Sequence, residues 1–258
     1  MALRSVFNAT VCLAGINVPV KLFTATENKR VSFKQVHAPD GAPIEHRRID
    51  PDSGETVPYS DVVKGYEVGD GEFVELTKDE VKAAAGERTK AIPIEDFVDA
   101  DAIAPEYFDK TYYLGAREGG ERAYRVLQEA LERTGRAGIG RMTFHDREYL
   151  VAVRALDDVL GLHTMRFGDE VVDPDDVELS RPEKGPSERE VTMAGALVES
   201  LGDDWKPEAQ PDEHRERVLA LVEAKASGKQ VVQPQADEPG ESSDLLAALE
   251  ASIKGKSR

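Results

Sequence analysis

The segment at residues 13–27, LAGINVPVKLFTATE, alternates apolar and polar side chains, and this period of two predicts a β-strand with one buried face. Its apolar positions are Ile16, Val18, Val20 and Leu22. Pro19 lies inside the run, and proline has no backbone N–H to donate to a sheet. We therefore expect the strand at a sheet edge or at the start of a pairing region.

A meander of three more strands is predicted at residues 139–144, 149–155 and 159–167, with turns at residues 145–147 and 157–158. In its last strand, one face carries Leu160, Leu162, Thr164 and Arg166. The meander indicates that strands dominate the middle of the chain.

Helices are predicted at four places between and after the strands. A capping box at residues 77–80 starts a short helix, and residues 120–134 carry the clearest amphipathic pattern. A second capping box at residues 187–190 and the proline at position 211 start two more helices. Many strands and few helices in mixed order favour an α+β protein with a barrel-like sheet.

Residues 29–59 form a long polar excursion between predicted strands. Turn signals occur at residues 39–41 and 50–54. A ribbon this polar cannot bury a core of its own. We therefore expect it to lie on a partner or to reach across one.

The net charge of −17 is distributed unevenly along the chain. Residues 1–50 hold seven Lys and Arg against four Asp and Glu, and residues 133–168 hold six against four. These stretches could face phosphates, while acidic surface elsewhere would confine a nucleic acid to one path. The alternative is an acidic protein-interaction scaffold without nucleic-acid binding, whose charge only keeps it soluble.

Cys12 is the only cysteine, which excludes an intrachain disulfide and a thiolate zinc site. No run approaches the ~18 apolar residues of a membrane span. The first twenty residues lack the apolar block and the cleavage site of a signal peptide. We expect a cytoplasmic protein without a membrane association.

No enzyme signature is recognisable in the sequence, which lacks Walker, G-x-S-x-G and H-E-x-x-H motifs. The glycine-rich run at residues 135–140 follows a predicted helix and precedes a strand, which reverses the order of a Rossmann loop. His37 and His46 have no metal spacing and are either phosphate contacts or ordinary surface residues. We predict no enzyme, no cofactor and no metal, with an unrecognised hydrolase as the alternative.

Four motifs occur in order: GINVPVKLFTATE at residues 15–27, VSFKQVH at residues 31–37, VPYSDVVKGYE at residues 57–67 and YFDKTYYL at residues 107–114. Together they resemble the core of the bacterial Ku proteins, the homodimeric DNA-end binders of non-homologous end joining. The resemblance runs from about residue 4 to residue 170 and more loosely to residue 228.

The resemblance implies a Ku-type β-barrel core at residues 1–172, whose ribbon-like bridge at residues 28–60 closes a DNA-encircling ring in the homodimer. Such a ring binds linear double-stranded DNA ends independently of sequence. The C-terminal helical arm at residues 187–228 would recruit and stimulate DNA ligase D, and the protein would be nucleoid-associated. Residues 229–258 are expected to be a flexible tail, whose short helix at residues 245–253 contacts ligase, DNA or neither.

The sequence departs from the family pattern in two places. Many Ku relatives carry a paired-cysteine, zinc-ribbon-like element before the VPY motif, but residues 47–56 contain no cysteine. We therefore predict no metal there and a turn held by Asp50, Asp52, Ser53 and Gly54. Phe7 stands where relatives often have tryptophan, which keeps an aromatic anchor.

Basic residues in or beside these motifs are the candidates for DNA contact, because sequence-independent binding needs positive charge along the phosphates. The candidates are Arg4, Arg30, Lys34, Arg47, Arg48, Lys64, Arg141 and Arg166. Each of them is alternatively a surface charge or the partner of a nearby carboxylate. No catalytic residue is predicted, and Tyr112, Tyr113 and Phe144 are expected in the core rather than as stacking platforms.

Overall fold

The structure is a computed structural model that describes residues 3–84, 90–144, 147–180, 184–202 and 204–228. The chain divides into two compact units. The first consists of the chain up to Asn28 together with Gln35–Asp176, and the second of Lys29–Lys34 together with the chain from Val177 onward. Within the described residues, every helix is too short or too polar to pass through a lipid bilayer.

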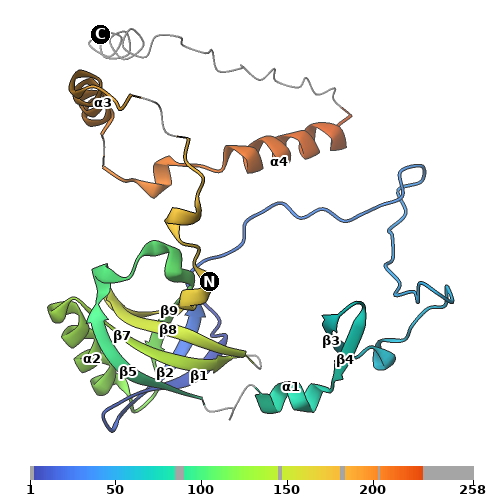
Figure 1. The fold of residues 1–258 in the computed structure, drawn as a ribbon, viewed down its shortest axis with the longest axis horizontal. Coiled ribbons are helices and arrows are strands. Elements are labelled where there is room, and N and C mark those ends of the chain that lie inside the picture. Colours follow the sequence, from blue (N-terminus) through green and yellow to red (C-terminus); the bar gives the residue numbers. More distant parts are fainter. Residues whose placement is uncertain (1–2, 85–89, 145–146, 181–183, 203, 229–258) are drawn as a thin grey trace. The chain divides into compact units, whose positions relative to one another are not determined.

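The first unit contains a closed barrel with the strand order β1-β2-β6-β9-β8-β7-β5 (Figure 1). Its strands are β1 (Phe7–Leu13), β2 (Ile16–Thr24), β5 (Ala91–Asp99), β6 (Phe108–Ala116), β7 (Arg136–Phe144), β8 (Arg147–Leu156) and β9 (Val159–Met165). Neighbouring strands are antiparallel except β1 and β5, whose parallel pairing closes the barrel. The predicted α+β class and barrel-like sheet are confirmed.

Strand β2 confirms the strand predicted near the start of the chain. Val20 and Leu22 are buried in the barrel, whereas Ile16, next to the turn from β1, is exposed. Pro19 lies one residue before the pairing of β2 with β6, which begins at Val20 and Ala116. The proline is therefore next to the start of this pairing, as predicted, although it also lies opposite Thr10 within the ladder that joins β1 and β2.

The predicted meander is the run β7-β8-β9, which pairs antiparallel in sequence order. Asp157 and Asp158 form the turn between β8 and β9, and Asp157 adopts the left-handed conformation with φ of 47°. Aspartate visits this region more readily than most residues. Leu160 and Leu162 are buried in the core as the alternation predicts, while Arg166 lies beyond the end of β9.

The apolar core receives side chains from every strand of the barrel and from the helix that follows β6. Its buried members are Ala9, Val11, Val18, Val20, Leu22, Ile92, Tyr112, Leu114, Tyr124, Leu127, Leu131, Met142, Val151, Val153, Leu160 and Leu162. Gly140 has no room for a side chain, because a Cβ there would collide with the carbonyl oxygen of Pro93. The prediction for Tyr113 is wrong: alternation on β6 turns it away from the core, and it is 38% exposed.

Helix α2 (Glu121–Thr134) packs against β2, β7 and β8. The hydroxyl of Tyr124 donates to the carbonyl oxygen of Leu114 at 2.6 Å and accepts from the backbone N–H of Leu160 at 2.8 Å. Gly135 ends the helix in the left-handed conformation, with φ of 63°. The helix predicted at residues 120–134 is therefore confirmed.

Between β2 and β5 the chain leaves the barrel. This part contains a 3-10 turn at Tyr59–Asp61, strands β3 (Lys64–Gly69) and β4 (Glu72–Leu76), and helix α1 (Lys78–Ala84). The predicted capping box starts α1: the Oγ1 of Thr77 accepts from the N–H of Glu80 at 3.2 Å, and Glu80 Oε2 accepts from the N–H of Thr77 at 2.8 Å. The hydrogen bonds from the side chain and backbone of Thr77 lower the pKa of Glu80.

The second unit contains helices α3 (Glu188–Leu201) and α4 (Glu213–Ala226). The predicted capping box at α3 is confirmed, since Glu190 Oε2 accepts from the N–H of Ser187 at 2.6 Å and Ser187 Oγ accepts in return at 3.3 Å. No residue of either helix is buried. The helix predicted at residues 245–253 lies outside the described residues.

The remaining short helices are single 3-10 turns at Ala100–Ala102, Pro105–Tyr107, Gly168–Glu170, Pro174–Asp176 and Pro207–Ala209.

Candidate nucleic-acid interface

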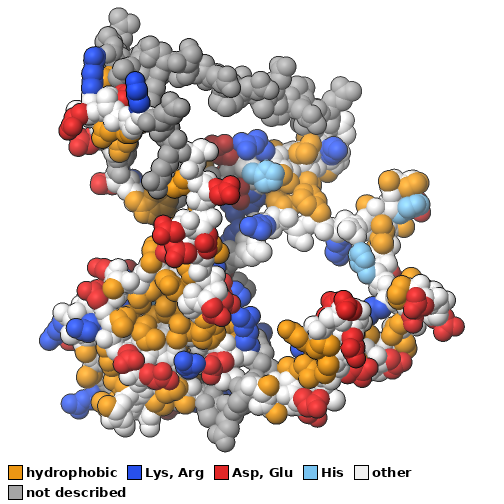
Figure 2. Space-filling view, in the orientation of Figure 1, with side chains coloured by type: hydrophobic (Ala, Val, Ile, Leu, Met, Phe, Trp, Pro, Cys, Tyr) orange, Lys and Arg blue, Asp and Glu red, His pale blue; other side chains and the backbone are white. Residues whose placement is uncertain are grey.

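Residues 32–76 bury almost none of their side chains, and within this range only Asp50 and Val57 are even half-buried. Figure 2 shows apolar side chains at the surface around β3 and β4. The large apolar residues exposed here are Phe33, Val36, Ile44, Ile49, Tyr59, Val62, Val63, Tyr66, Val68, Phe73, Val74 and Leu76. A two-stranded hairpin is marginally stable alone, and large exposed apolar patches are typical of contact surfaces, so this stretch is a candidate for a contact with another surface.

A tight turn at residues 50–54 shapes the middle of the exposed stretch. The Oδ1 of Asp50 accepts from the backbone N–H groups of Asp52 at 2.8 Å and Ser53 at 3.2 Å, and Gly54 is left-handed with φ of 71°. The predicted turn is confirmed, although Asp52 contributes its backbone rather than its side chain. Within the described residues, no three His, Cys, Asp or Glu side chains are placed to hold a metal ion.

The turn brings Arg48 to the ring of Tyr59. The N–H of Val57 donates to the carbonyl oxygen of Arg48 at 2.9 Å, and the Cζ of Arg48 lies 5.0 Å from the Tyr59 ring centroid. A guanidinium stacked in this way is oriented by the ring, while its in-plane N–H donors keep the geometry that suits phosphate oxygens. We did not predict Tyr59; the signal available for it was the turn, which forces residues on its two sides to meet.

Arg47 adds a second cation beside Arg48. Its Nη2 lies 4.0 Å from the Oε2 of Glu45, and both side chains are exposed. A surface ion pair of this length contributes little, so a phosphate competes readily with the carboxylate. Arg47 and Arg48 are thus consecutive exposed cations, of which Arg47 faces Glu45 and Arg48 is stacked on Tyr59.

An earlier turn positions His37. Its Nδ1 is 2.8 Å from the Oδ1 of Asp40, which also accepts from the N–H of Ala42 at 3.1 Å. The hydrogen bond from Ala42, and then the one from His37, lower the pKa of Asp40. A phosphate contact at His37 would have to compete with this carboxylate.

Lys64 begins β3 and pairs with Leu76 at the end of β4. It shares one face of the hairpin with Leu76 and with the directly opposed pair Tyr66 and Val74. The opposite face carries two glutamates and Phe73. One face of the hairpin is therefore mainly apolar, with Lys64 at one end and Glu72 at the other, and the opposite face is acidic around one aromatic ring.

Arg141 and Arg166 have partners inside the barrel unit. The Nη1 of Arg141 lies 3.1 Å from the Oε2 of Glu148 on the neighbouring strand. The Nη1 of Arg166 donates to the carbonyl oxygens of Glu106 at 2.8 Å and Phe108 at 2.7 Å. Arg166 thus joins two parts of the barrel unit, whereas the exposed ion pair of Arg141 contributes little, and a phosphate would have to compete with the partners of both arginines.

The remaining three candidates lie at exposed positions on other segments. Arg4 precedes β1, while Arg30 and Lys34 belong to the segment Lys29–Lys34 of the second unit. Within that unit, Arg30 lines a cavity of about 320 Å³ to which α4 contributes Arg215. We did not predict Arg215, because its helical pattern gave no sign that an extended segment lies beside it.

Comparison with known proteins identifies the family of this arrangement. The sequence model of the Ku70/Ku80 beta-barrel domain matches residues 13–193. The chain belongs to the Ku family. The Ku match starts at the last residue of β1, includes the whole exposed stretch, and ends within α3.

Proteins that are similar to this chain over nearly its full length belong to the same family by name. The Non-homologous end joining protein Ku of Anaeromyxobacter sp. (strain K) is 40% identical over 99% of this chain and 86% of its own length. The protein of that name from Mycobacterium tuberculosis (strain CDC 1551 / Oshkosh) is 35% identical, over 99% and 97%. That of Opitutus terrae (strain DSM 11246 / JCM 15787 / PB90-1) is 33% identical, over 97% and 91%. The resemblance based on four motifs is thereby confirmed.

Proposed function

We propose that this Ku protein binds the ends of double-stranded DNA in non-homologous end joining, as a homodimer whose two copies encircle the duplex. The observation that carries the proposal is the exposed stretch at residues 32–76, which needs a covering surface and presents Arg47 and Arg48. The relatives are named for non-homologous end joining, which supports a role in that process. The chain would act in the cytoplasm, on the DNA of the nucleoid, without a chemical step of its own.

A second copy is the partner that we assign to the apolar face of the β3–β4 hairpin. Tyr66, Val74 and Leu76 share this face and are exposed. Burial of an aromatic or large aliphatic side chain contributes about 1.5–3 kcal/mol of stabilising free energy. A hairpin whose side chains stay exposed to water does not gain this free energy. Two copies that cover these faces would enclose a space, and only a free end could enter it.

Charge distribution supports contact with phosphates without base readout. Arginine donates in a fork that matches phosphate oxygens, and contacts to the backbone carry no sequence information. Residues 32–76 themselves hold four Lys and Arg against ten Asp and Glu, so contact with phosphates would be confined to the local cations, and the acidic surface around them would limit the DNA to one path. Topology, rather than base contacts, would then supply the preference for ends.

The helical arm is the part that we assign to DNA ligase D. Helices α3 and α4 bury no residue, and Trp205 between them is 78% exposed. Exposed tryptophan is enriched among the residues that dominate protein interfaces. Recruitment and stimulation of the ligase would therefore depend on this arm.

The decisive experiment compares linear and circular DNA by mobility shift at two salt concentrations. We expect a salt-dependent shift of the linear duplex, no shift of the closed circle, and several copies on a longer linear fragment. Equal binding of circles and linear fragments would eliminate threading. Absence of any shift at low salt would favour the acidic scaffold that binds no nucleic acid.

Charge reversal tests the phosphate contacts. Arg47→Glu combined with Arg48→Glu should weaken binding to all sequences alike by at least tenfold and flatten the salt dependence. Arg189→Glu with Arg217→Glu changes the charge equally on the helical arm and should leave DNA affinity within about twofold. A defect confined to one DNA sequence would contradict phosphate contact.

A separate variant tests the arm. Trp205→Ala should weaken binding of purified DNA ligase D by at least tenfold, about 1.4 kcal/mol, without affecting the shift of linear DNA. Isothermal titration of the ligase with the full chain measures the first effect. Unchanged ligase affinity would remove Trp205 from the interface.

A further inference from the structure

Helix α2 is fixed on the barrel by its inner face, so its outer face is a rigid surface. Leu127 and Leu131 are buried in the core, and the hydroxyl of Tyr124 is hydrogen-bonded at both of its positions. The Nε2 of Gln128 donates to the carbonyl oxygen of Asp157 at 3.0 Å. These contacts prevent the helix from rotating to bury any other side.

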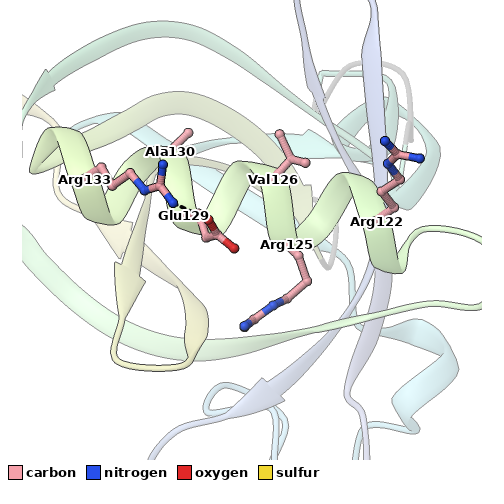
Figure 3. Close-up of a pocket in the computed structure, with 6 residues that line it drawn as sticks. All are labelled: Arg122, Arg125, Val126, Glu129, Ala130 and Arg133. Carbon is pink, nitrogen blue, oxygen red and sulfur yellow. Dashed lines mark hydrogen bonds and ion pairs between the residues drawn. The ribbon is translucent and has the colours of Figure 1, made fainter.

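The outer face contains a shallow hollow of about 380 Å³. It is lined by Arg122, Arg125, Val126, Glu129, Ala130 and Arg133 (Figure 3). In this view, Val126 and Ala130 extend from one edge of the helix and Arg125 from the opposite edge. Val126 is 63% exposed. The hollow therefore combines two apolar side chains, Val126 and Ala130, with the guanidinium groups of three arginines.

The charges of the hollow are only partly compensated. The Nη2 of Arg133 lies 2.8 Å from the Oε2 of Glu129, so these two side chains neutralise each other. In the part of the chain that the structure describes, neither Arg122 nor Arg125 forms an ion pair with a carboxylate. Two such cations on a chain with a net charge of −17 make this face a local site of attraction for anionic groups.

Its dimensions and chemistry fit a helix rather than a nucleic acid. At 1.5 Å per residue, the distance along α2 from Arg122 to Arg133 is about 16 Å, or roughly three helical turns. An aliphatic side chain can cover Val126, and carboxylates on its flanks can accept from the two arginines. A DNA backbone offers no apolar group that could cover Val126.

We propose that the outer face of α2 docks an acidic amphipathic helix of a partner protein. None of the eight residues that we propose for phosphate contact lies on α2, so this surface would be distinct from the proposed DNA interface. It would therefore permit a second protein to bind while DNA is held.

A set of three synthetic peptides tests the chemistry with the full chain. The probe is a fluorescein-labelled 14-residue peptide with leucine at positions i, i+3, i+4 and i+7 and glutamate on both flanks, titrated by fluorescence anisotropy. We expect saturable binding that weakens with salt. A peptide of the same composition with scrambled leucine spacing should bind at least tenfold more weakly, and one with lysine in place of glutamate should not bind.

Matched variants locate the binding on α2. Arg122→Glu with Arg125→Glu should weaken binding of the probe at least tenfold, while binding of linear DNA stays unchanged. Lys90→Glu with Lys110→Glu makes the same change of charge at exposed positions of the barrel and should have an effect below twofold. Equal weakening by both pairs would show non-specific attraction and overturn the proposal.

Hydrogen exchange of the α2 amides distinguishes an acidic helix from the two other possible partners of this face, which are DNA and a second copy of the chain. We expect protection by the acidic peptide, and none by linear duplex or by raising the protein concentration. Protection by the duplex would make this a nucleic-acid surface, and protection that grows with concentration would make it a contact between copies. Either result would overturn the assignment to an acidic partner helix.

Discussion

The barrel and the stretch at residues 32–76 lie in one chain, yet they bury their side chains to opposite extents. Leu162 in the barrel is 0% exposed, whereas Phe73 in the hairpin is 60% exposed. Each strand of the barrel has two neighbours, and its interior is continuous apolar core. The hairpin has two strands, and both of its faces meet solvent. The comparison teaches that the barrel buries enough apolar surface to stabilise itself, while the stretch leaves its apolar side chains in solvent.

The largest expected effect is on stability, and it is tested by truncating one large side chain to alanine in each of the two regions. Leu162→Ala should destabilise the barrel by about 2–5 kcal/mol, because it removes buried methyl groups and leaves a cavity. Phe73→Ala should change the unfolding of the barrel by less than about 0.5 kcal/mol, because it removes an exposed side chain. Both effects are measured by urea unfolding, with hydrogen exchange of the β8 and β9 amides as the probe of the barrel. Comparable losses of unfolding free energy in the two variants would mean that the hairpin supports the barrel.

A smaller effect compares the two faces of the hairpin. Tyr66→Ser with Val74→Ser should weaken the dimer at least tenfold, about 1.4 kcal/mol, because it removes apolar surface assigned to the second copy. Glu67→Ser with Glu75→Ser alters the opposite face and should leave association within about threefold. Sedimentation equilibrium measures both; an intact dimer in the first variant would show that this face is not the interface.

The smallest effect concerns a buried histidine of the barrel. Burial, followed by the nearby charge of Arg154, lowers the pKa of His163, and its Nδ1 lies 3.0 Å from the Oγ1 of Thr111. Because the folded pKa lies below the unfolded value near 6.5, the unfolded state takes up the proton first. Stability should therefore fall as the pH drops from 7 to 5.5.

The control for this effect is His163→Gln, which cannot titrate. Its urea midpoint should vary less with pH over the same range than that of the wild-type chain. The range from pH 5.5 to 7 lies above the pKa values of ordinary carboxylates, so their titration does not contribute to the change in the midpoint. Identical pH profiles for the two proteins would show that His163 makes no contribution.

Local patterns predicted most of the elements correctly. Strand β2, the meander β7-β8-β9, the capped helices and the turn at residues 50–54 all follow from side chains within a few positions of one another. Such spacing is enough because strand alternation, capping boxes and turns are satisfied by neighbours along the chain. Tyr113 was predicted wrongly because composition suggested a core residue, while alternation on β6 turned it outward.

The candidate site was predictable only as a set of basic residues. Their number and positions can be read from the sequence, but not their partners. Arg166 is held by backbone carbonyls of a distant loop, and Arg48 is stacked on Tyr59 across a turn. A residue's availability for phosphate depends on such contacts, which no local period encodes.

The sequence by itself determined strand β2, the meander β7-β8-β9 and the helices, although not the hairpin β3-β4, and it carried the four ordered motifs of the Ku family. Only the tertiary structure decided that β1 and β5 pair in parallel to close the barrel, and that residues 32–76 contribute almost nothing to its core. The physical reason is range. Periodicity records the surroundings of near neighbours, whereas barrel closure and burial depend on residues far apart in the chain that meet only after folding.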